Sequence, residues 1–95
     1  MAKILGTEHP SENQVLFRLS AALPPESCRT YDNPAEALEN GLARALFLIM
    51  GVQEVRIATD HVILTRTPET IWPLIIPPAI NIISSRVKQF KTEVA

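Results

Sequence analysis

Apolar and polar residues alternate along residues 14–19 (QVLFRL), which is the pattern of a strand with one buried face. The alternation places Leu16 and Arg18 on one face and the other apolar residues on the opposite face: Val15, Phe17 and Leu19. A pair of prolines at 24 and 25 then stops regular pairing, because proline lacks a backbone donor. Residues 27–31 (SCRTY) have the pattern of a second, shorter strand. The chain is therefore predicted to open with two strands.

Apolar and polar residues alternate within 52–66 on both sides of Thr59-Asp60, and this pattern predicts a β-hairpin that turns at those two residues. A two-residue loop pairs the strands in one register: Ala58 with His61, Ile57 with Val62, Arg56 with Ile63, and Val55 with Leu64. The pattern favours this register, since a slip of one residue would mix the apolar and polar faces. Thr-Asp is a weak hairpin dipeptide, so a longer loop is the alternative.

Residues 34–50 have apolar positions at helical spacing. The stripe consists of Leu38, Leu42, Ala45, Leu46 and Ile49. Asn33 before Pro34 is a good helix start, and Gly51 is a typical left-handed C-terminal residue. Asn40-Gly41 interrupts the pattern, because a glycine inside a helix costs about 1 kcal/mol relative to alanine. Two interpretations stay open: one helix over 34–50, or a turn over 34–39 followed by a helix that Asn40 caps.

The last apolar segment combines a helical stripe with prolines. The stripe consists of Ala79, Ile82, Ile83, Val87 and Phe90. Pro77 and Pro78 each lack a donor, and each disfavours helical geometry in the residue before it. We expect a helical turn at 70–75, a kink or break at 76–78, and a helix from Pro78 or Ala79 onward.

The elements follow in the order β-β-α-β-β-α, and their burial patterns define the architecture. Two amphipathic helices cover the apolar face of an antiparallel sheet, which gives a two-layer α+β sandwich with both helices on one face. The other face of the sheet meets solvent. On the predicted register it displays Arg18, Glu54, Arg56, His61 and Ile63, together with Arg29 or Tyr31.

Length and charge limit the possible classes of protein. The 95 residues form one domain, residues 1–95, because so short a chain buries only one core. Nine basic and ten acidic residues give a net charge of −1, whereas binding to nucleic acid needs a large cationic excess. No apolar run approaches the ~20 residues that span a bilayer, and the first residues do not form a signal peptide. We expect a cytoplasmic protein that binds neither nucleic acid nor membrane.

Candidate catalytic and metal-binding groups are few. Cys28, Asp60 and His61 are the residue types of a thiol nucleophile, its orienting acid and its base, but their spacing indicates nothing. Because Cys28 is the single cysteine, no disulfide framework forms, and one thiol alone does not make a zinc or iron–sulfur site. No ligand-spaced histidines occur, and the three glycines do not form a phosphate loop. We expect no catalytic residue, no metal and no cofactor.

The remaining candidates for binding are arginines on the solvent face and the single tryptophan. Arg18 and Arg56 fit either an ordinary solvated surface or a contact surface, since acidic residues are interspersed with them. Trp72, in an aliphatic segment, is either a core residue or an anchor in a protein interface. The predicted partner-binding residues are Arg18, Arg56, His61, Ile63 and Trp72.

Residues 31–66 resemble the N-terminal domain of the Nfu/NifU-type iron–sulfur cluster scaffold proteins. The matching features are the segment Leu42 to Phe47 with Ile49, Gly51-Val52, an aspartate at the hairpin turn (Asp60), the strand Val62 to Arg66, and Trp72 followed by Pro77. The likeness covers roughly residues 31–83 well and the first strand loosely. The segment EHPSENQ departs from the family pattern, and Pro73 and Pro78 differ from its usual polar helix start.

The resemblance implies a β-β-α-β-β-α fold. It also implies a module that recognises other proteins and does not itself hold the cluster. In such proteins a C-x-x-C pair in a separate C-terminal domain holds the cluster, and this sequence has no C-x-x-C, so no cluster ligand is transferred. A homodimer that shared a cluster through two copies of Cys28 would leave half of its ligand positions empty.

The function implied is that of a non-catalytic protein-interaction module, an accessory in iron–sulfur cluster assembly or delivery. Its partners would be assembly factors or client apoproteins. The alternative is a small ligand- or peptide-binding regulatory domain, which would have a concave apolar pocket beside the last segment. A thiol-dependent enzyme built on Cys28 is a third hypothesis.

Overall fold

The computed structural model describes residues 4–20, 22–23, 25, 28–38 and 40–94, with side chains described as far as residue 85. The chain forms a five-stranded antiparallel sheet in the order β1-β2-β5-β4-β3. The strands are β1 (Ile4–Glu8), β2 (Gln14–Leu19), β3 (Thr30–Tyr31), β4 (Val52–Ile57) and β5 (His61–Arg66). The β2–β5 pairing places strands from the two halves of the chain side by side in the middle of the sheet.

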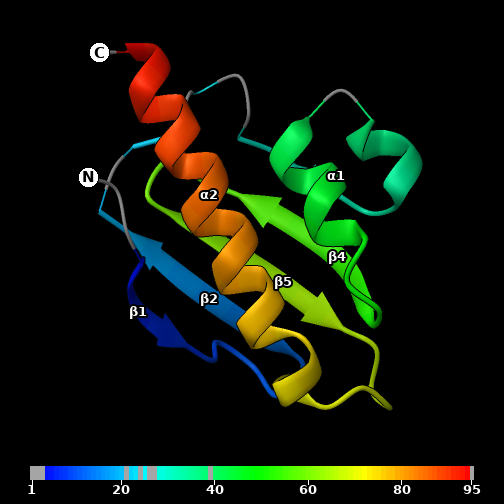
Figure 1. The fold of residues 1–95 in the computed structure, drawn as a ribbon. Helices are drawn as coiled ribbons and strands as arrows, with labels where there is room; N and C mark the ends of the chain where they lie inside the picture. Colours follow the sequence, from blue (N-terminus) through cyan, green and yellow to red (C-terminus); the bar gives the residue numbers. More distant parts are fainter. Residues whose placement is uncertain (1–3, 21, 24, 26–27, 39, 95) are drawn as a thin grey trace.

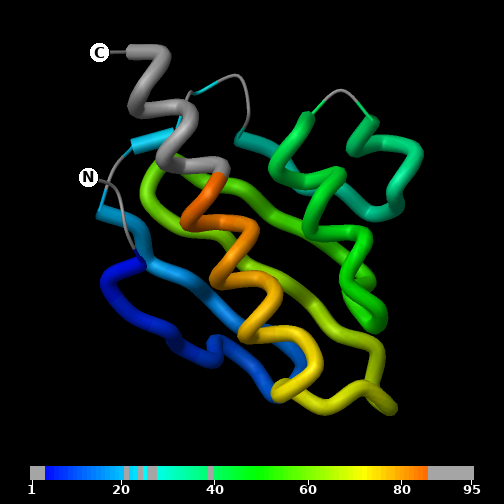
Figure 2. The backbone as a smooth tube through the Cα atoms, viewed as in Figure 1, coloured from blue at the N-terminus to red at the C-terminus, as the bar shows by residue number. Residues whose placement is uncertain are grey.

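Two α-helices lie on one face of this sheet (Figure 1). Helix α1 spans Gly41–Phe47 and α2 spans Ile76–Val94. Each follows a short 3-10 helix, at Pro34–Ala37 and at Trp72–Leu74. The backbone trace shows α2 crossing the sheet diagonally, with α1 beside it over the β4 side (Figure 2). The predicted two-layer α+β sandwich with both helices on one face is confirmed.

Strand β1 is an element that the sequence pattern does not predict. It pairs with β2 after a tight connection, and Glu8 stands opposite Leu16. The ladder shifts between Ile4 and Gly6, and such a bulge breaks the alternation by which a strand is found in sequence. At the other edge, β3 is shorter than the predicted 27–31, and residue 27 lies outside the described residues.

The predicted register of the 52–66 hairpin is confirmed. Strands β4 and β5 pair Val55 with Leu64, Arg56 with Ile63, and Ile57 with Val62. The amide of Ala58 donates to the carbonyl of His61 at 2.9 Å, which closes the hairpin around Thr59-Asp60. The burial pattern is the physical reason, since this register places Val55, Ile57, Val62 and Leu64 all on the covered face.

Asn40 caps the start of α1, as the second interpretation of this segment predicts, and the interpretation as a single helix over 34–50 is wrong. The Asn40 backbone is extended, and its side-chain Oδ1 accepts from the amide of Ala43 at 2.9 Å. Asn33 caps the preceding 3-10 helix instead, accepting from the amide of Glu36 at 3.0 Å. Each asparagine thus satisfies amides that have no partner at a helix start, and the chain uses two short helices where the stripe suggests one.

The break predicted at 76–78 is also wrong. Helix α2 begins at Ile76, and Pro77 and Pro78 lie in its first turn, where backbone donors have no intrahelical partner to lose. The predicted helical turn before it is confirmed at Trp72–Leu74. Of the predicted stripe, Ala79 and Ile83 are buried, while the side chains of residues 87 and 90 lie outside the described part. None of the described helices has the length and apolar character needed to cross a membrane.

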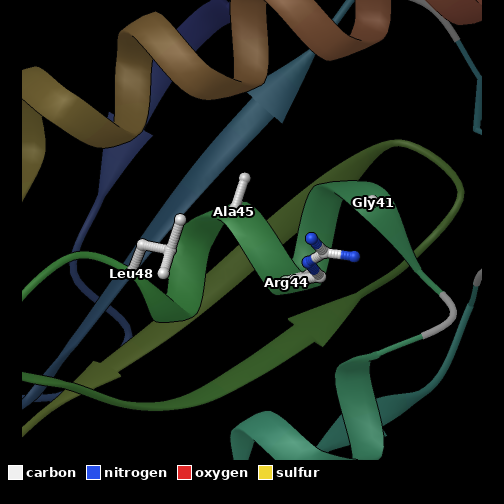
Figure 3. Close-up of a pocket in the computed structure, with 4 residues that line it drawn as sticks. All are labelled: Gly41, Arg44, Ala45 and Leu48. Atoms are coloured by element: carbon white, nitrogen blue, oxygen red, sulfur yellow. The ribbon is translucent and has the colours of Figure 1, made fainter.

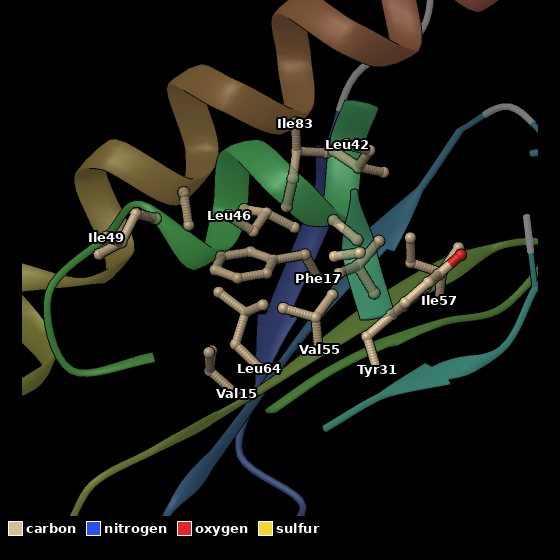
Figure 4. Close-up of a cluster of buried hydrophobic side chains, with 14 of the residues drawn as sticks. Val15, Phe17, Tyr31, Leu42, Leu46, Ile49, Val55, Ile57, Leu64 and Ile83 are labelled. Carbon is tan, nitrogen blue, oxygen red and sulfur yellow. The ribbon is translucent and has the colours of Figure 1, made fainter. Parts of the chain in front are cut away.

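The core lies between the sheet and the two helices (Figure 4). Phe17 of β2 is fully buried at its centre, with Leu64 on the adjacent strand β5 and Val55 one strand further, on β4. Leu46 of α1 and Ile83 of α2 close the cluster from the helix layer. Tyr31 belongs to this cluster, and Arg29 stacks over its ring with the guanidinium carbon 4.7 Å from the centroid. Arg29 and Tyr31, of which the sequence predicts one or the other on the solvent face, therefore both lie away from that face.

Candidate protein-interaction surface

The side of the sheet away from the helices has no covering element in the described part of the chain (Figure 1). We call this side the open face. Strand pairing arranges its side chains in cross-strand rows, since residues opposite each other point the same way. The open face consists of Glu8, Gln14, Leu16, Arg18, Thr30, Glu54, Arg56, His61, Ile63 and Thr65.

Arg18 and Glu8 form an ion pair across β1 and β2. The Arg18 Nη2 and Nε atoms donate to one Glu8 carboxylate oxygen at 2.8 and 3.1 Å. The hydrogen bond and the charge of Glu8 raise the pKa of the Arg18 guanidinium. The two side chains are about half exposed, 47 % and 56 %, so solvent screens the pair and its contribution to stability is small. Sequence reasoning missed Glu8 because it missed β1.

His61 stands opposite Arg18 on β5 and pairs with its own neighbour, Asp60. Their side chains approach to 2.7 Å between Nδ1 and Oδ1. Donation from the imidazole lowers the pKa of the Asp60 carboxyl, and the Arg18 charge adds to the effect. The Arg18–His61 row of the open face thus has a carboxylate partner at each of its two basic side chains, Glu8 at Arg18 and Asp60 at His61.

The middle row places an apolar pair between polar ends. Leu16 and Ile63 are opposite each other on β2 and β5, and Arg56 follows on β4. Arg56 is exposed, and its Nε donates to the Thr30 hydroxyl at 3.3 Å. Ile63 lies on the predicted face but is only 9 % exposed, because its neighbours cover it. The exposed groups of this row are therefore Arg56 and, opposite Leu16 on β1, Glu8.

Trp72 does not lie with the other four predicted residues. It is half-buried against the core at the end of the sheet. The Arg66 guanidinium carbon stacks 4.6 Å from its ring centroid, and the His9 ring lies 5.2 Å from it at 57°. Arg66 also donates to the backbone oxygens of Thr70 at 2.8 Å and Glu12 at 3.2 Å. Trp72 thus links the β1–β2 connection to the segment before α2, and it is not part of the open face.

A groove of about 240 Å³ lies along α1 on the opposite side of the molecule from the open face (Figure 3). Its lining residues are Gly41, Arg44, Ala45 and Leu48, all from α1 or its C-terminal cap. The volume is below the roughly 300–1,000 Å³ of small-molecule sites, and one helix alone does not enclose a ligand. The groove does not match the pocket beside the last segment that the regulatory-domain hypothesis requires.

The described side chains do not form a metal site. Within the described ranges, no three histidine, cysteine, aspartate or glutamate side chains gather to hold an ion. The whole sequence has one cysteine, and iron–sulfur clusters are held chiefly by several thiolates. The donor set of this chain therefore does not fit a bound cluster.

A five-stranded antiparallel sheet, with two helices on one face and a largely polar second face that no described element covers, defines a small α+β domain. The sequence matches the family described as scaffold protein Nfu/NifU N terminal over residues 4–89. Because the match covers nearly the whole chain, the chain belongs to the Nfu/NifU N-terminal family. The resemblance seen in residues 31–83 is confirmed, and the match extends it back to β1. No curated protein matched the sequence.

Solved structures share the fold. A NifU-like protein from Saccharomyces cerevisiae superposes with a TM-score of 0.73 at 24 % identity, covering 94 % of this chain and 79 % of that one. Protein SAV1430 from Staphylococcus aureus superposes with a TM-score of 0.70 at 17 % identity, covering 85 % of this chain and 98 % of that one. At these identities the likeness shows the fold alone, and it agrees with the family.

Proposed function

We propose that this chain is a non-catalytic protein-interaction module that serves as an accessory in the assembly or delivery of iron–sulfur clusters. The family supports the connection with cluster scaffolds. The observation that supports binding is the open face, where Arg18, Arg56 and His61 stand beside Glu8 and Asp60 with no described element over them. Mixed charges on such a face favour orientation and selection of a protein partner more than raw affinity.

The cluster itself is cargo of the partners in this proposal. The single cysteine and the scattered carboxylates supply too few ligands, so the chain orients proteins that do hold clusters. The partners are assembly factors or client apoproteins, and the compartment proposed for this role is the cytoplasm.

Affinity purification with mass spectrometry tests the proposal. The wild-type chain is compared with an Arg18→Glu/Arg56→Glu variant, which reverses two charges on the open face. Arg29→Glu is the matched control, because Arg29 is an exposed arginine that stacks on Tyr31 away from this face. We expect cluster-assembly or cluster-containing proteins with the wild type and the control, and their loss with the double variant. Enrichment of none of these proteins by the wild type contradicts the proposal.

A further inference from the structure

Helix α1 is apolar on nearly every side. Residues 41–50 (GLARALFLIM) contain one charged residue, Arg44. The inner side is fully buried and consists of Leu42, Ala43 and Leu46. A helix with solvent on its outer side normally has polar residues there. The outer side of α1 instead has Gly41, Ala45 and Leu48 around Arg44, at intervals of three and four residues, and these four line the groove of Figure 3.

The apolar character increases toward the C-terminal end of α1. Leu48 is 82 % exposed and Met50 is 88 % exposed, the highest values among the large apolar side chains described. The amide of Thr67 donates to the carbonyl of Gly51 at 2.9 Å, so the segment that leads to the exposed Ile71 lies against this same end. Large apolar side chains this exposed, gathered at one helix end rather than scattered singly over the surface, are typical of sites of protein contact. We call Gly41, Arg44, Ala45, Leu48 and Met50 the α1 strip.

The charge of the strip indicates what covers it. Arg44 is exposed and forms no ion pair with any described carboxylate, unlike Arg18, which Glu8 neutralises. A second copy is disfavoured as occupant. Two α1 helices packed antiparallel about a twofold axis would set Gly41 opposite Leu48, which brings the two Arg44 side chains together. Like charges in contact are costly, so the strip is complementary to an acidic partner.

We propose that the α1 strip docks a helix of a partner protein that presents apolar side chains to Leu48 and Met50 and a carboxylate to Arg44. The part of the strip that lines the groove runs seven residue steps from Gly41 to Leu48, about 10 Å at 1.5 Å per residue, which matches two turns of a partner helix. The inference rests on the proposed function, because it concerns a chain that acts by binding proteins. It adds a second contact surface on the helix layer, on the other side of the core from the open face.

Nuclear magnetic resonance with defined peptides tests the inference on the whole chain. The probe is a synthetic amphipathic helix of roughly 15 residues, with leucines spaced by three and four and one flanking glutamate. A second peptide has lysine in place of that glutamate. We expect saturable shifts of the amides of residues 41–51 and binding of the glutamate peptide at least about threefold tighter than the lysine peptide.

Substitutions identify the contacts. Arg44→Glu reverses the peptide preference, and Leu48→Ala weakens binding of the glutamate peptide by about tenfold. Leu38→Ala is the matched control, an exposed leucine outside the strip, and leaves binding unchanged. The inference is overturned if amides 41–51 do not shift, if both peptides bind equally, or if these amides shift with protein concentration alone, which would reveal a second copy. Assembly proteins that still bind a chain failing this test would leave the proposed function intact.

Discussion

Gly51, between α1 and β4, is the backbone position at which the fold depends most plainly on one residue type. Its φ is +97°, and it is the one residue with positive φ among those described. The sequence predicts a left-handed glycine that closes a helix over 34–50. The structure confirms the left-handed backbone, but α1 ends at Phe47 with its C-cap at Leu48, so Gly51 lies in the turn that leads to β4. A β-carbon here would also fall within 2.8 Å of three Thr70 side-chain atoms. Gly51→Ala therefore combines backbone strain with a steric clash.

The two costs are separable. The left-handed backbone costs alanine about 1–2 kcal/mol, and overpacking against Thr70 adds about 1–3 kcal/mol. We expect Gly51→Ala to lower the free energy of unfolding by about 2–5 kcal/mol, a large share of the ~5–15 kcal/mol typical of a domain. In a Thr70→Ala background two of the three clashing atoms are gone, so the penalty of Gly51→Ala falls by about 1 kcal/mol.

Urea unfolding followed by fluorescence of the single tryptophan, Trp72, measures these differences. Gly6→Ala is the matched control, because no atom lies within 4 Å of the β-carbon that it adds and its φ is not positive. That substitution is expected to be neutral or to stabilise by up to about 1 kcal/mol. Equal effects of alanine at Gly51 and Gly6 would show that the left-handed backbone at Gly51 costs alanine nothing, and a Gly51 penalty unchanged by Thr70→Ala would show that no clash with Thr70 occurs.

Three further substitutions test the cap, the core and the charge pairs. Asn40→Ala removes the acceptor for the Ala43 amide and should cost about 1 kcal/mol in urea unfolding; an unchanged midpoint contradicts the cap. Leu46→Ala should cost about 2–5 kcal/mol in the same assay, since Leu46 is fully buried, and a loss below 1 kcal/mol would place it outside the core. The lowered pKa of Asp60 means that its contribution to stability exists above the unfolded pKa and is lost as pH falls through the folded pKa. A carboxyl titration by nuclear magnetic resonance should show that the pKa of Asp60 rises in His61→Ala. An unchanged pKa would show that the 2.7 Å hydrogen bond from His61 does not lower it.

The elements with regular alternation could be predicted from sequence, and those defined by tertiary contacts could not. The 52–66 hairpin has apolar residues that only one register places together, so its pairing follows from pattern alone. Strand β1 has a glycine and a bulge, and it is held by pairing with β2 rather than by its own alternation. The sequence pattern predicts a start of α2 that is two or three residues too late, because it does not show that Pro77 falls in the first turn of the helix.

The candidate site likewise has one part that the sequence pattern predicts and another that depends on tertiary contacts. Arg18, Arg56, His61 and Ile63 come together on the open face because the predicted register places them there. The register does not predict how far neighbours cover Ile63, nor the stack of Arg66 on Trp72. These depend on side-chain conformations and on segments brought together only by the complete fold.

We propose that the chain binds proteins of iron–sulfur cluster assembly through the open face. The most direct measurement is a titration of the isotope-labelled chain with a purified cluster-assembly scaffold or client apoprotein, followed by its amide resonances. We expect saturable shifts of the amides of Arg18, Arg56 and His61, which are lost in the Arg18→Glu/Arg56→Glu variant and kept in Arg29→Glu. Saturable binding that leaves these three amides unmoved, or no binding by any such protein, would contradict it.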